Sequence, residues 1–156
     1  MARRNEHVEW KYDDKAMELG VSFYRQSEIP LDLLYHLMRS KHLNTFSVIM
    51  LHSKMENFGK FLKEHKRKTD LLYGIETQEN IYALFCQETH VDGGFYFIKR
   101  LQTLMENESS DDICAAIIGV ESTVYPVKDL MFMILDTFIR ARSPENPERV
   151  IFKTVK

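Results

Sequence analysis

The sequence predicts a single α/β (α+β) domain in which a five-stranded central sheet with an antiparallel hairpin is flanked by helices. Short apolar runs typical of buried strands alternate with longer segments in which apolar residues recur at helical spacing. Two of the short runs are joined by only five polar residues, a length suited to an antiparallel hairpin. A chain of 156 residues without an internal repeat, a low-complexity tract or an interdomain linker is most simply one domain.

The N-terminal part of the chain predicts a polar lead-in and two helices. Residues 1–12 are polar and mixed in charge, so we expect a poorly ordered segment before a domain that covers residues 13–156. Apolar side chains at helical spacing predict a first helix over about residues 13–26. Because proline is accommodated in the first turn of a helix, we expect Pro30 to open a second helix that ends near Lys41.

The middle of the chain predicts a strand, a basic helix and the hairpin. The run 46–51 is apolar and partly β-branched, which is typical of a central strand covered by helices on both faces. A helix with one apolar stripe and several lysines is expected over about residues 56–66. Residues 71–75 and 81–86 then form the two hairpin strands, joined by the polar residues 76–80.

The last third of the chain predicts two more helix and strand pairs. A helix is expected over about residues 92–105 and is followed by a core strand at 113–120. The final helix is expected over 127–140, and an edge strand over 149–153. The predicted order is therefore α-α-β-α-β-β-α-β-α-β.

The composition is that of an ordinary globular protein. Hydrophobic residues make up 44% of the chain and charged residues 28%, with a net charge of -2, so bulk charge gives no sign of DNA or RNA binding. Cys86 and Cys114 lie in apolar runs, which predicts buried thiols in a reducing cytosol. No apolar run approaches the ~20 residues of a membrane helix. We therefore expect a cytoplasmic protein, with recruitment to the inner membrane by a partner as an open option.

The segment Arg67-Lys-Thr-Asp70 stands where the basic helix meets the hairpin. An arginine and an aspartate at this spacing can present a bidentate donor and an acceptor to one ligand. The arginine suits the N7 and O6 acceptors of guanine, and the carboxylate suits its N1–H and N2–H donors. The alternative is an i,i+3 ion pair at a helix end, worth about 0.2–0.5 kcal/mol and without a function. The basic run 60–68 is by itself more typical of a solvated helix face than of an RNA-binding strip.

The order of these elements resembles the GGDEF domain of diguanylate cyclases. The likeness covers about residues 30–153 and implies a nucleotide-cyclase or palm-like fold. The sequence is also similar to the cyclic di-GMP receptor domain of the Pel polysaccharide system, which combines a degenerate signature with an arginine–aspartate site. The segments that carry the likeness are Met38-Arg-Ser-Lys-His-Leu-Asn-Thr-Phe-Ser-Val-Ile-Met-Leu51, Arg67-Lys-Thr-Asp70, Ala83-Leu-Phe-Cys-Gln-Glu-Thr89, Ile117-Ile-Gly-Val120, Ala141-Arg142 and Glu148-Arg-Val-Ile-Phe152.

The features to which the resemblance assigns catalysis are missing. The Gly-Gly-Asp/Glu-Glu-Phe signature is replaced by Glu76-Thr-Gln-Glu-Asn-Ile-Tyr82, so side chains obstruct the close approach of GTP that glycines allow. His52 stands where active members place a metal-binding aspartate, and Lys54 would repel Mg²⁺. The substrate-binding segment after this strand is also largely deleted, since Met55 passes almost directly into Glu56. We therefore expect no enzyme activity, no catalytic residue and no metal site.

The resemblance implies that a regulatory site survives. In the family, an Arg-x-x-Asp shortly before the hairpin binds the product, cyclic di-GMP, and Arg67 and Asp70 match this motif. A second arginine on the helix after the hairpin often completes the site, and Arg100 stands at the corresponding place. Lys66 and Lys99 add positive charge for the two phosphates. The predicted ligand is therefore cyclic di-GMP, bound by these five residues.

The resemblance further implies a regulated partner protein or complex, such as exopolysaccharide synthesis or secretion machinery, and it leaves a homodimer open. Two other functions also stay open. One is a ligand-free module that keeps the cyclase fold for dimerisation or docking, and the other is a residual enzyme that holds GTP between the hairpin and the first strand. His52 with His65, His90 or Cys86 lacks the close spacing of metal ligands, so we interpret these histidines as structural.

Overall fold

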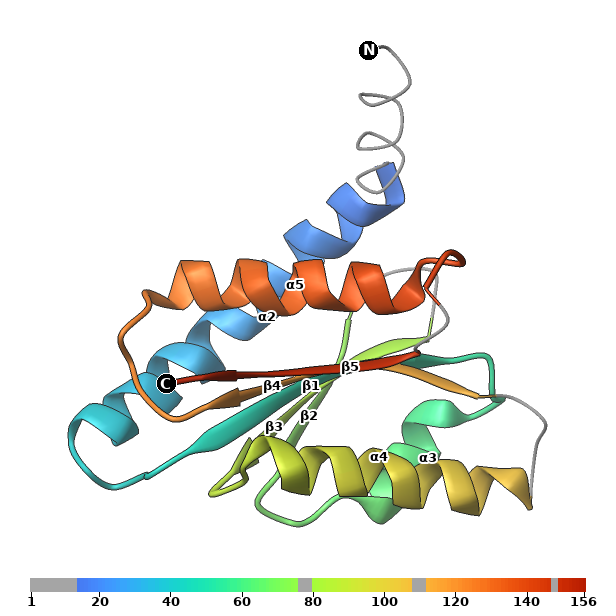
Figure 1. Cartoon of the computed structure of the whole chain (residues 1–156), viewed down its shortest axis with the longest axis horizontal. Coiled ribbons are helices and arrows are strands. Elements are labelled where there is room, and N and C mark those ends of the chain that lie inside the picture. Colours follow the sequence, from blue (N-terminus) through green and yellow to red (C-terminus); the bar gives the residue numbers. More distant parts are fainter. Residues whose placement is uncertain (1–13, 76–79, 108–111, 147–148) are drawn as a thin grey trace.

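The five strands form one mixed sheet with two described helices against each face (Figure 1). The computed structural model of the chain describes residues 14–75, 80–107, 112–146 and 149–156. The predicted lead-in at residues 1–12 lies outside this part of the chain.

The elements follow the predicted order except at the N-terminus, where two expected helices are one. Helices α2 and α5 cover one face of the sheet, and α3 and α4 cover the other (Figure 1). In chain order the described elements are α2 (Asp14–Arg39), β1 (Phe46–Ser53), α3 (Phe58–His65), β2 (Leu71–Gly74), β3 (Ile81–Gln87), α4 (Val91–Glu106), β4 (Ile113–Val120), α5 (Val127–Arg142) and β5 (Val150–Val155).

Strand β1 occupies the centre of the sheet, whose order is β2-β3-β1-β4-β5. It pairs antiparallel with both neighbours, so that Phe46 lies opposite Gln87 of β3 and Val120 of β4. Successive side chains of a strand point to opposite faces. Met50 accordingly packs under α2 and α5, whereas Leu51 packs under α3 and α4. The prediction of a central strand buried on both faces is confirmed.

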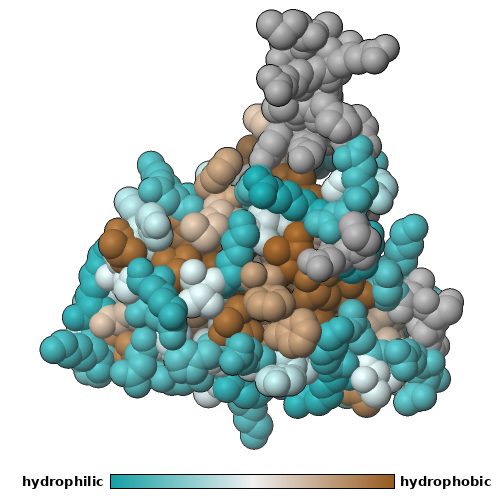
Figure 2. All heavy atoms as spheres, viewed as in Figure 1, coloured by the Kyte–Doolittle hydropathy of each residue, from teal (hydrophilic) through white to brown (hydrophobic). Residues whose placement is uncertain are grey.

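The hairpin and the last strand form the two edges of the sheet. Strand β2 pairs antiparallel with β3 from Leu71 opposite Phe85 to Gly74 opposite Tyr82, which confirms the predicted hairpin. Strand β5 pairs parallel with β4 and confirms the predicted edge strand. Figure 2 shows hydrophobic side chains gathered near the middle of the face on which β5 runs. Phe152 of β5 is among the exposed large hydrophobic residues.

Helix α2 corrects the prediction of two helices separated before Pro30. A proline inside a helix removes one hydrogen bond and costs about 3 kcal/mol. Here the buried row of α2 continues through the proline, with Phe23 before it and Leu31 and Leu34 after it. Burying each such side chain stabilises the fold by about 1.5–3 kcal/mol, so tertiary packing outweighs the local cost. Neither this helix nor any other in the described part of the chain has the length and apolar character needed to cross a membrane.

Both cysteines are buried and free, as predicted. Cys114 lies in the core under α2 and α5, and Cys86 lies in the core under α3 and α4. Burial raises the pKa of the Cys114 thiol to about 11, because the thiolate would lose its hydration. Both side chains therefore pack as small hydrophobic groups.

Candidate functional site

The residues Arg67 to Asp70 form a turn that joins the end of α3 to the start of β2. The backbone nitrogen of Asp70 donates to the carbonyl of Arg67 at 3.1 Å, and the backbone nitrogen of Arg67 donates to Asp70 Oδ2 at 2.9 Å. Aspartate favours such turns because its short side chain can accept a hydrogen bond from the nearby backbone. The turn is thus closed in both directions, and the carboxylate of Asp70 is fixed by the backbone nitrogen of Arg67.

The side chains of Arg67 and Asp70 form an ion pair within this turn. Arg67 Nη2 lies 2.8 Å from Asp70 Oδ1, and Nε lies 3.1 Å from the same oxygen. The aspartate side chain is only 4% exposed, whereas the arginine side chain is 51% exposed. The hydrogen bond to Asp70 raises the pKa of Arg67, against a smaller opposing effect of burial. A buried carboxylate is therefore compensated by a half-exposed guanidinium.

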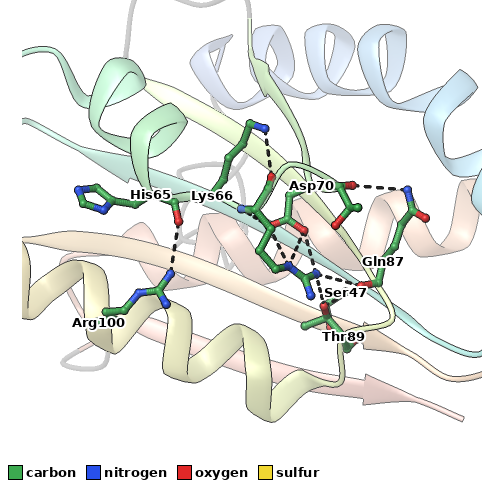
Figure 3. Close-up of polar contacts among 9 residues, drawn as sticks. Ser47, His65, Lys66, Asp70, Gln87, Thr89 and Arg100 are labelled. Atoms are coloured by element: carbon green, nitrogen blue, oxygen red, sulfur yellow. Dashed lines mark hydrogen bonds and ion pairs between the residues drawn. The ribbon is translucent and has the colours of Figure 1, made fainter.

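Arg67 also ties the turn to the end of β3. Its Nη2 atom donates to the carbonyl of Gln87 at 2.9 Å and to Thr89 Oγ1 at 2.6 Å (Figure 3). Thr89 is held in turn by Ser47 of β1, whose hydroxyl donates to the Thr89 carbonyl at 2.7 Å. Atoms Nε and Nη2 are therefore engaged, while Nη1 donates to none of the described residues.

A pocket of about 610 Å³ opens beside this pair. Two segments that are distant in sequence form its walls: the turn before β2, and the continuous stretch from the end of β3 into the first turns of α4. Its lining residues are Arg67, Asp70, Cys86, Glu88, Thr89, His90, Asp92, Gly93, Gly94, Tyr96, Phe97 and Arg100.

Arg100 reaches this pocket from α4. Its Nη2 atom donates to the carbonyl of His65 at 3.3 Å (Figure 3). Its guanidinium carbon lies 5.3 Å from the centre of the Phe97 ring. Both contacts are weak and leave the side chain exposed. The pocket thus brings together Arg67, Asp70 and Arg100, three of the five residues predicted from the sequence.

The two predicted lysines do not line the pocket. Lys66 Nζ donates to the carbonyl of Arg67 at 3.2 Å, which places it on the outside of the same turn. Lys99 Nζ lies over the ring of Phe95, 5.2 Å from its centre. Their charges lie near the pocket without forming its wall.

Several lining residues were missed in the sequence. Tyr96 and Phe97 are aromatic residues on the helix that carries Arg100, and Thr89 and His90 follow β3. The spacing of Tyr96 four residues before Arg100 places both on one face of α4, and this signal was available. The position of Thr89 against Arg67 depends on the sheet register, which the sequence does not reveal.

Cys86 lies beneath Asp70 at the base of the pocket. The two residues adjoin because Leu71 is paired with Phe85, which brings the preceding Asp70 alongside Cys86. Burial first, and the negative charge of Asp70 second, raise the pKa of the Cys86 thiol far above its usual value. A neutral buried thiol is a poor nucleophile, so this cysteine supports the pocket without reactive chemistry.

The region that the resemblance assigns to catalysis lies at the other end of β1. His52 pairs with Ile81 of β3 and with Cys114 of β4. The ring of Tyr82 packs edge-on against Phe58 at 5.8 Å. Within the described ranges, no three histidine, cysteine or acidic residues are grouped so as to hold a metal ion. Residues 76–79, which include most of the altered signature, lie outside those ranges.

Comparison with known proteins identifies the fold. The GGDEF domain of FimX from Pseudomonas aeruginosa superimposes with a TM-score of 0.58 at 12% identity, covering 81% of this chain and 92% of that domain. The active GGEEF domain of a diguanylate cyclase from Vibrio cholerae gives 0.58 at 10% identity, covering 80% and 90%. The diguanylate cyclase SiaD from Pseudomonas aeruginosa, solved in complex with its activator SiaC, gives 0.57 at 10% identity, covering 83% of this chain and 57% of that one.

The sequence alone does not establish membership of a family. No protein-family model matches it, and a search of curated proteins gave no significant match. At 10–12% identity, the structural likeness is a likeness of fold. The predicted fold class is confirmed: the chain has the cyclase-like α+β fold of GGDEF domains.

Proposed function

We propose that this GGDEF-like domain is a receptor for cyclic di-GMP that has no cyclase activity and regulates a partner protein. The observation that carries the proposal is the meeting of Arg67, Asp70 and Arg100 in one pocket of about 610 Å³. Pockets of ~300–1,000 Å³ with a few convergent polar groups are typical of small-molecule sites. Arg67 lies in the turn before β2 and Arg100 lies on α4, so two guanidinium groups border the pocket from different segments. The carboxylates of Asp70, Glu88 and Asp92 also line it.

The Arg67–Asp70 pair has the groups that a guanine base requires. The Asp70 carboxylate can accept from the N1–H and N2–H of the base, and the Arg67 guanidinium can donate to its O6 and N7. Asp70 accepts from Arg67 Nε and Nη2. Binding therefore exchanges the side-chain ion pair, together with the bonds of Arg67 to Gln87 and Thr89, for contacts with the base. The half-exposed arginine can turn outward, while the backbone bond from Arg67 still holds Asp70 in place.

Arg100 is suited to the phosphates of the ligand. Its side chain is exposed and held only by a 3.3 Å hydrogen bond and a ring contact, so it can reorient at small cost. Arginine binds phosphate through two parallel hydrogen bonds. Lys66 and Lys99 do not line the pocket, so their contribution is a longer-range attraction that salt weakens.

The absence of cyclase activity is proposed from the residues at the end of β1. His52 and Lys54 occupy positions at which the resemblance calls for a metal-binding carboxylate and its surroundings. Mg²⁺ prefers oxygen ligands, which the imidazole of His52 does not offer, and the positive charge of Lys54 would repel the ion. In addition, Tyr82 fills the space above Gly59 so closely that a Cβ atom there would collide with the phenol ring. Phosphoryl transfer depends on positioning and on metal charge, and both are weakened.

A protein partner is supported by the exposed side of α2. Met17, Val21, Ile29 and Leu33 are large hydrophobic residues exposed along this helix. Exposed apolar residues in such number are typical of interaction surfaces. The structurally similar SiaD was solved with its activator SiaC, a precedent for a fold of this kind bound to another protein. We propose a regulated complex such as exopolysaccharide machinery, recruited at the inner membrane.

Calorimetric titration of the whole chain tests the proposal. Cyclic di-GMP, cyclic di-AMP and GTP with Mg²⁺ are each titrated, and product formation from GTP is followed separately. The receptor predicts micromolar or tighter binding of cyclic di-GMP, weaker binding of cyclic di-AMP and no turnover of GTP. Turnover of GTP would contradict the loss of catalysis.

A second candidate is a ligand-free docking module. The observation that favours it is that Arg67, from within the same turn, already donates to both carboxylate oxygens of Asp70. If none of the three nucleotides binds, this candidate replaces the receptor.

A further inference from the structure

Tyr96 is an exposed aromatic side chain on the wall of the pocket. Its side chain is 71% exposed, although most large hydrophobic residues of the chain are buried. Its ring contact within the described residues is a T-shaped one with the neighbouring Phe95, at 6.1 Å between ring centres. An aromatic ring that borders a pocket and is exposed to water is available to a ligand.

The position of Tyr96 on α4 places its side chain near Gly93, in the first turn of the helix. Side chains three or four residues apart share a face, so Tyr96 stands between Gly93 and Arg100. Long side chains in a helix lean toward its N-terminus, which carries the Tyr96 ring toward Gly93. All three residues line the same pocket.

Gly93 allows α4 to lie close to Thr89 on the wall of the pocket. A Cβ atom at Gly93 would lie 3.1 Å from Thr89 Cγ2, tighter than ordinary van der Waals contact. Thr89 is also the residue whose hydroxyl accepts from Arg67. A Cβ atom at position 93 would therefore press on a partner of Arg67.

A guanine base needs contacts to its faces as well as to its edges. Arg67 and Asp70 offer hydrogen bonds to the edges only. The other aromatic lining residue, Phe97, already has the Arg100 guanidinium over its ring. Tyr96 is the lining aromatic residue with no cation placed over it among the described contacts.

We infer that Tyr96 is a base-stacking residue of this pocket and that Gly93 allows Thr89, the partner of Arg67, to lie close to this wall, an inference that rests on the proposed binding of cyclic di-GMP. Stacking of a base on an aromatic side chain is sensitive to the ring and insensitive to the phenol hydroxyl. A variant that removes the Tyr96 ring should therefore weaken ligand binding, whereas a variant that removes only its hydroxyl should not.

Titration of cyclic di-GMP into four forms of the whole chain tests the stacking role. Tyr96→Leu keeps an apolar side chain and is expected to weaken binding by ~10- to 100-fold, in line with the loss of one stacked base. Tyr96→Phe keeps the ring and is expected to bind within ~3-fold of the wild type. Phe132→Leu is the matched control, because Phe132 is also an exposed aromatic residue but lies on α5, on the other face of the sheet.

A second variant tests the close approach at position 93. Gly93→Ala replaces glycine inside a helix and should raise helix stability by up to about 1 kcal/mol, while its Cβ presses on Thr89 and, through it, on Arg67. We expect unchanged or higher thermal stability together with weaker binding, a combination that a purely structural role would not give. Tyr96→Leu binding as tightly as the wild type would overturn the inference while leaving the receptor intact. If the wild type does not bind, the proposed function fails as well.

Discussion

The buried carboxylate of Asp70 accepts hydrogen bonds from both the backbone nitrogen and the guanidinium of Arg67. The backbone bond at 2.9 Å holds the carboxylate in place whatever the arginine side chain does. The guanidinium bonds are the ones that a guanine base can replace. The affinity for a ligand therefore depends on the difference between the contacts of Arg67 and Asp70 with each other and their contacts with the base. Variants of Arg67 should separate its role in ligand binding from its role in stabilising the turn.

Arg67→Lys keeps the positive charge and loses the bidentate fork. We expect cyclic di-GMP binding to weaken by ~10-fold or more, because lysine cannot donate two parallel hydrogen bonds to one base edge. The free energy of unfolding should fall by only about 1 kcal/mol, since the side chain is half exposed. Calorimetry and urea denaturation measure the two effects. Lys68→Ala, on the neighbouring exposed residue outside the pocket, should change neither.

Arg100→Ala should affect binding far more than stability. The side chain is exposed and makes one long hydrogen bond, so the free energy of unfolding should change by less than about 0.5 kcal/mol. Loss of its charge-assisted contact with phosphate should weaken cyclic di-GMP binding by ~10-fold. Lys99→Ala is the matched control, because Lys99 adjoins Arg100 but does not line the pocket. Equal losses in the two variants at physiological salt would contradict a direct role for Arg100.

Gly94→Ala should destabilise the fold, in contrast to the neighbouring Gly93→Ala. A Cβ atom at Gly94 would lie 2.8 Å from Ile117 Cγ2 of β4, so α4 would have to move off the sheet. Overpacking of this kind costs about 1–3 kcal/mol, which exceeds the gain in helix propensity. Urea denaturation should give a lower midpoint for Gly94→Ala than for the wild type. A midpoint at or above that of the wild type would mean that α4 does not pack as closely as described.

The thiol of Cys114 should make stability depend on alkaline pH. Its pKa is raised in the folded state to about 11 from 9.0, so the folded chain keeps a proton that the unfolded chain releases between these values. The stabilisation is complete below about pH 9 and is lost as the pH rises toward 11, with a total of ~2–3 kcal/mol. Urea denaturation of the wild type and Cys114→Ala across this range measures the difference. If the free energy of unfolding of the two proteins depends on pH in the same way, the raised pKa of Cys114 is contradicted.

The fold was largely predictable because its signals are local. The hairpin followed from two apolar runs and a short polar link, and β1 followed from an apolar run buried on both faces. The division of α2 at Pro30 was wrong because the cost of a helical proline is local, whereas the burial of Phe23 and Leu34 on either side of it is tertiary. Local rules therefore account for the cost of the proline but not for the packing of these side chains in the core.

The candidate site was predictable only in part. Arg67 and Asp70 are close in sequence, and their contact follows from a single turn. Arg100 was assigned through a resemblance, and the structure brings it to the same pocket. Tyr96 could have been found from its spacing to Arg100 on α4, whereas the contact of Thr89 with Arg67 and the meeting of α4 with the turn before β2 depend on the register of β3 and on tertiary packing. These are long-range relationships that no local pattern encodes.

Titration of cyclic di-GMP into the wild type and Asp70→Asn tests the central claim most directly. Asparagine has the shape of aspartate but lacks its charge, and it offers one acceptor oxygen where guanine presents two donors. The account predicts micromolar or tighter binding by the wild type and at least ~10-fold weaker binding by the variant. Equal affinities in the two proteins, or no binding by the wild type, would contradict it.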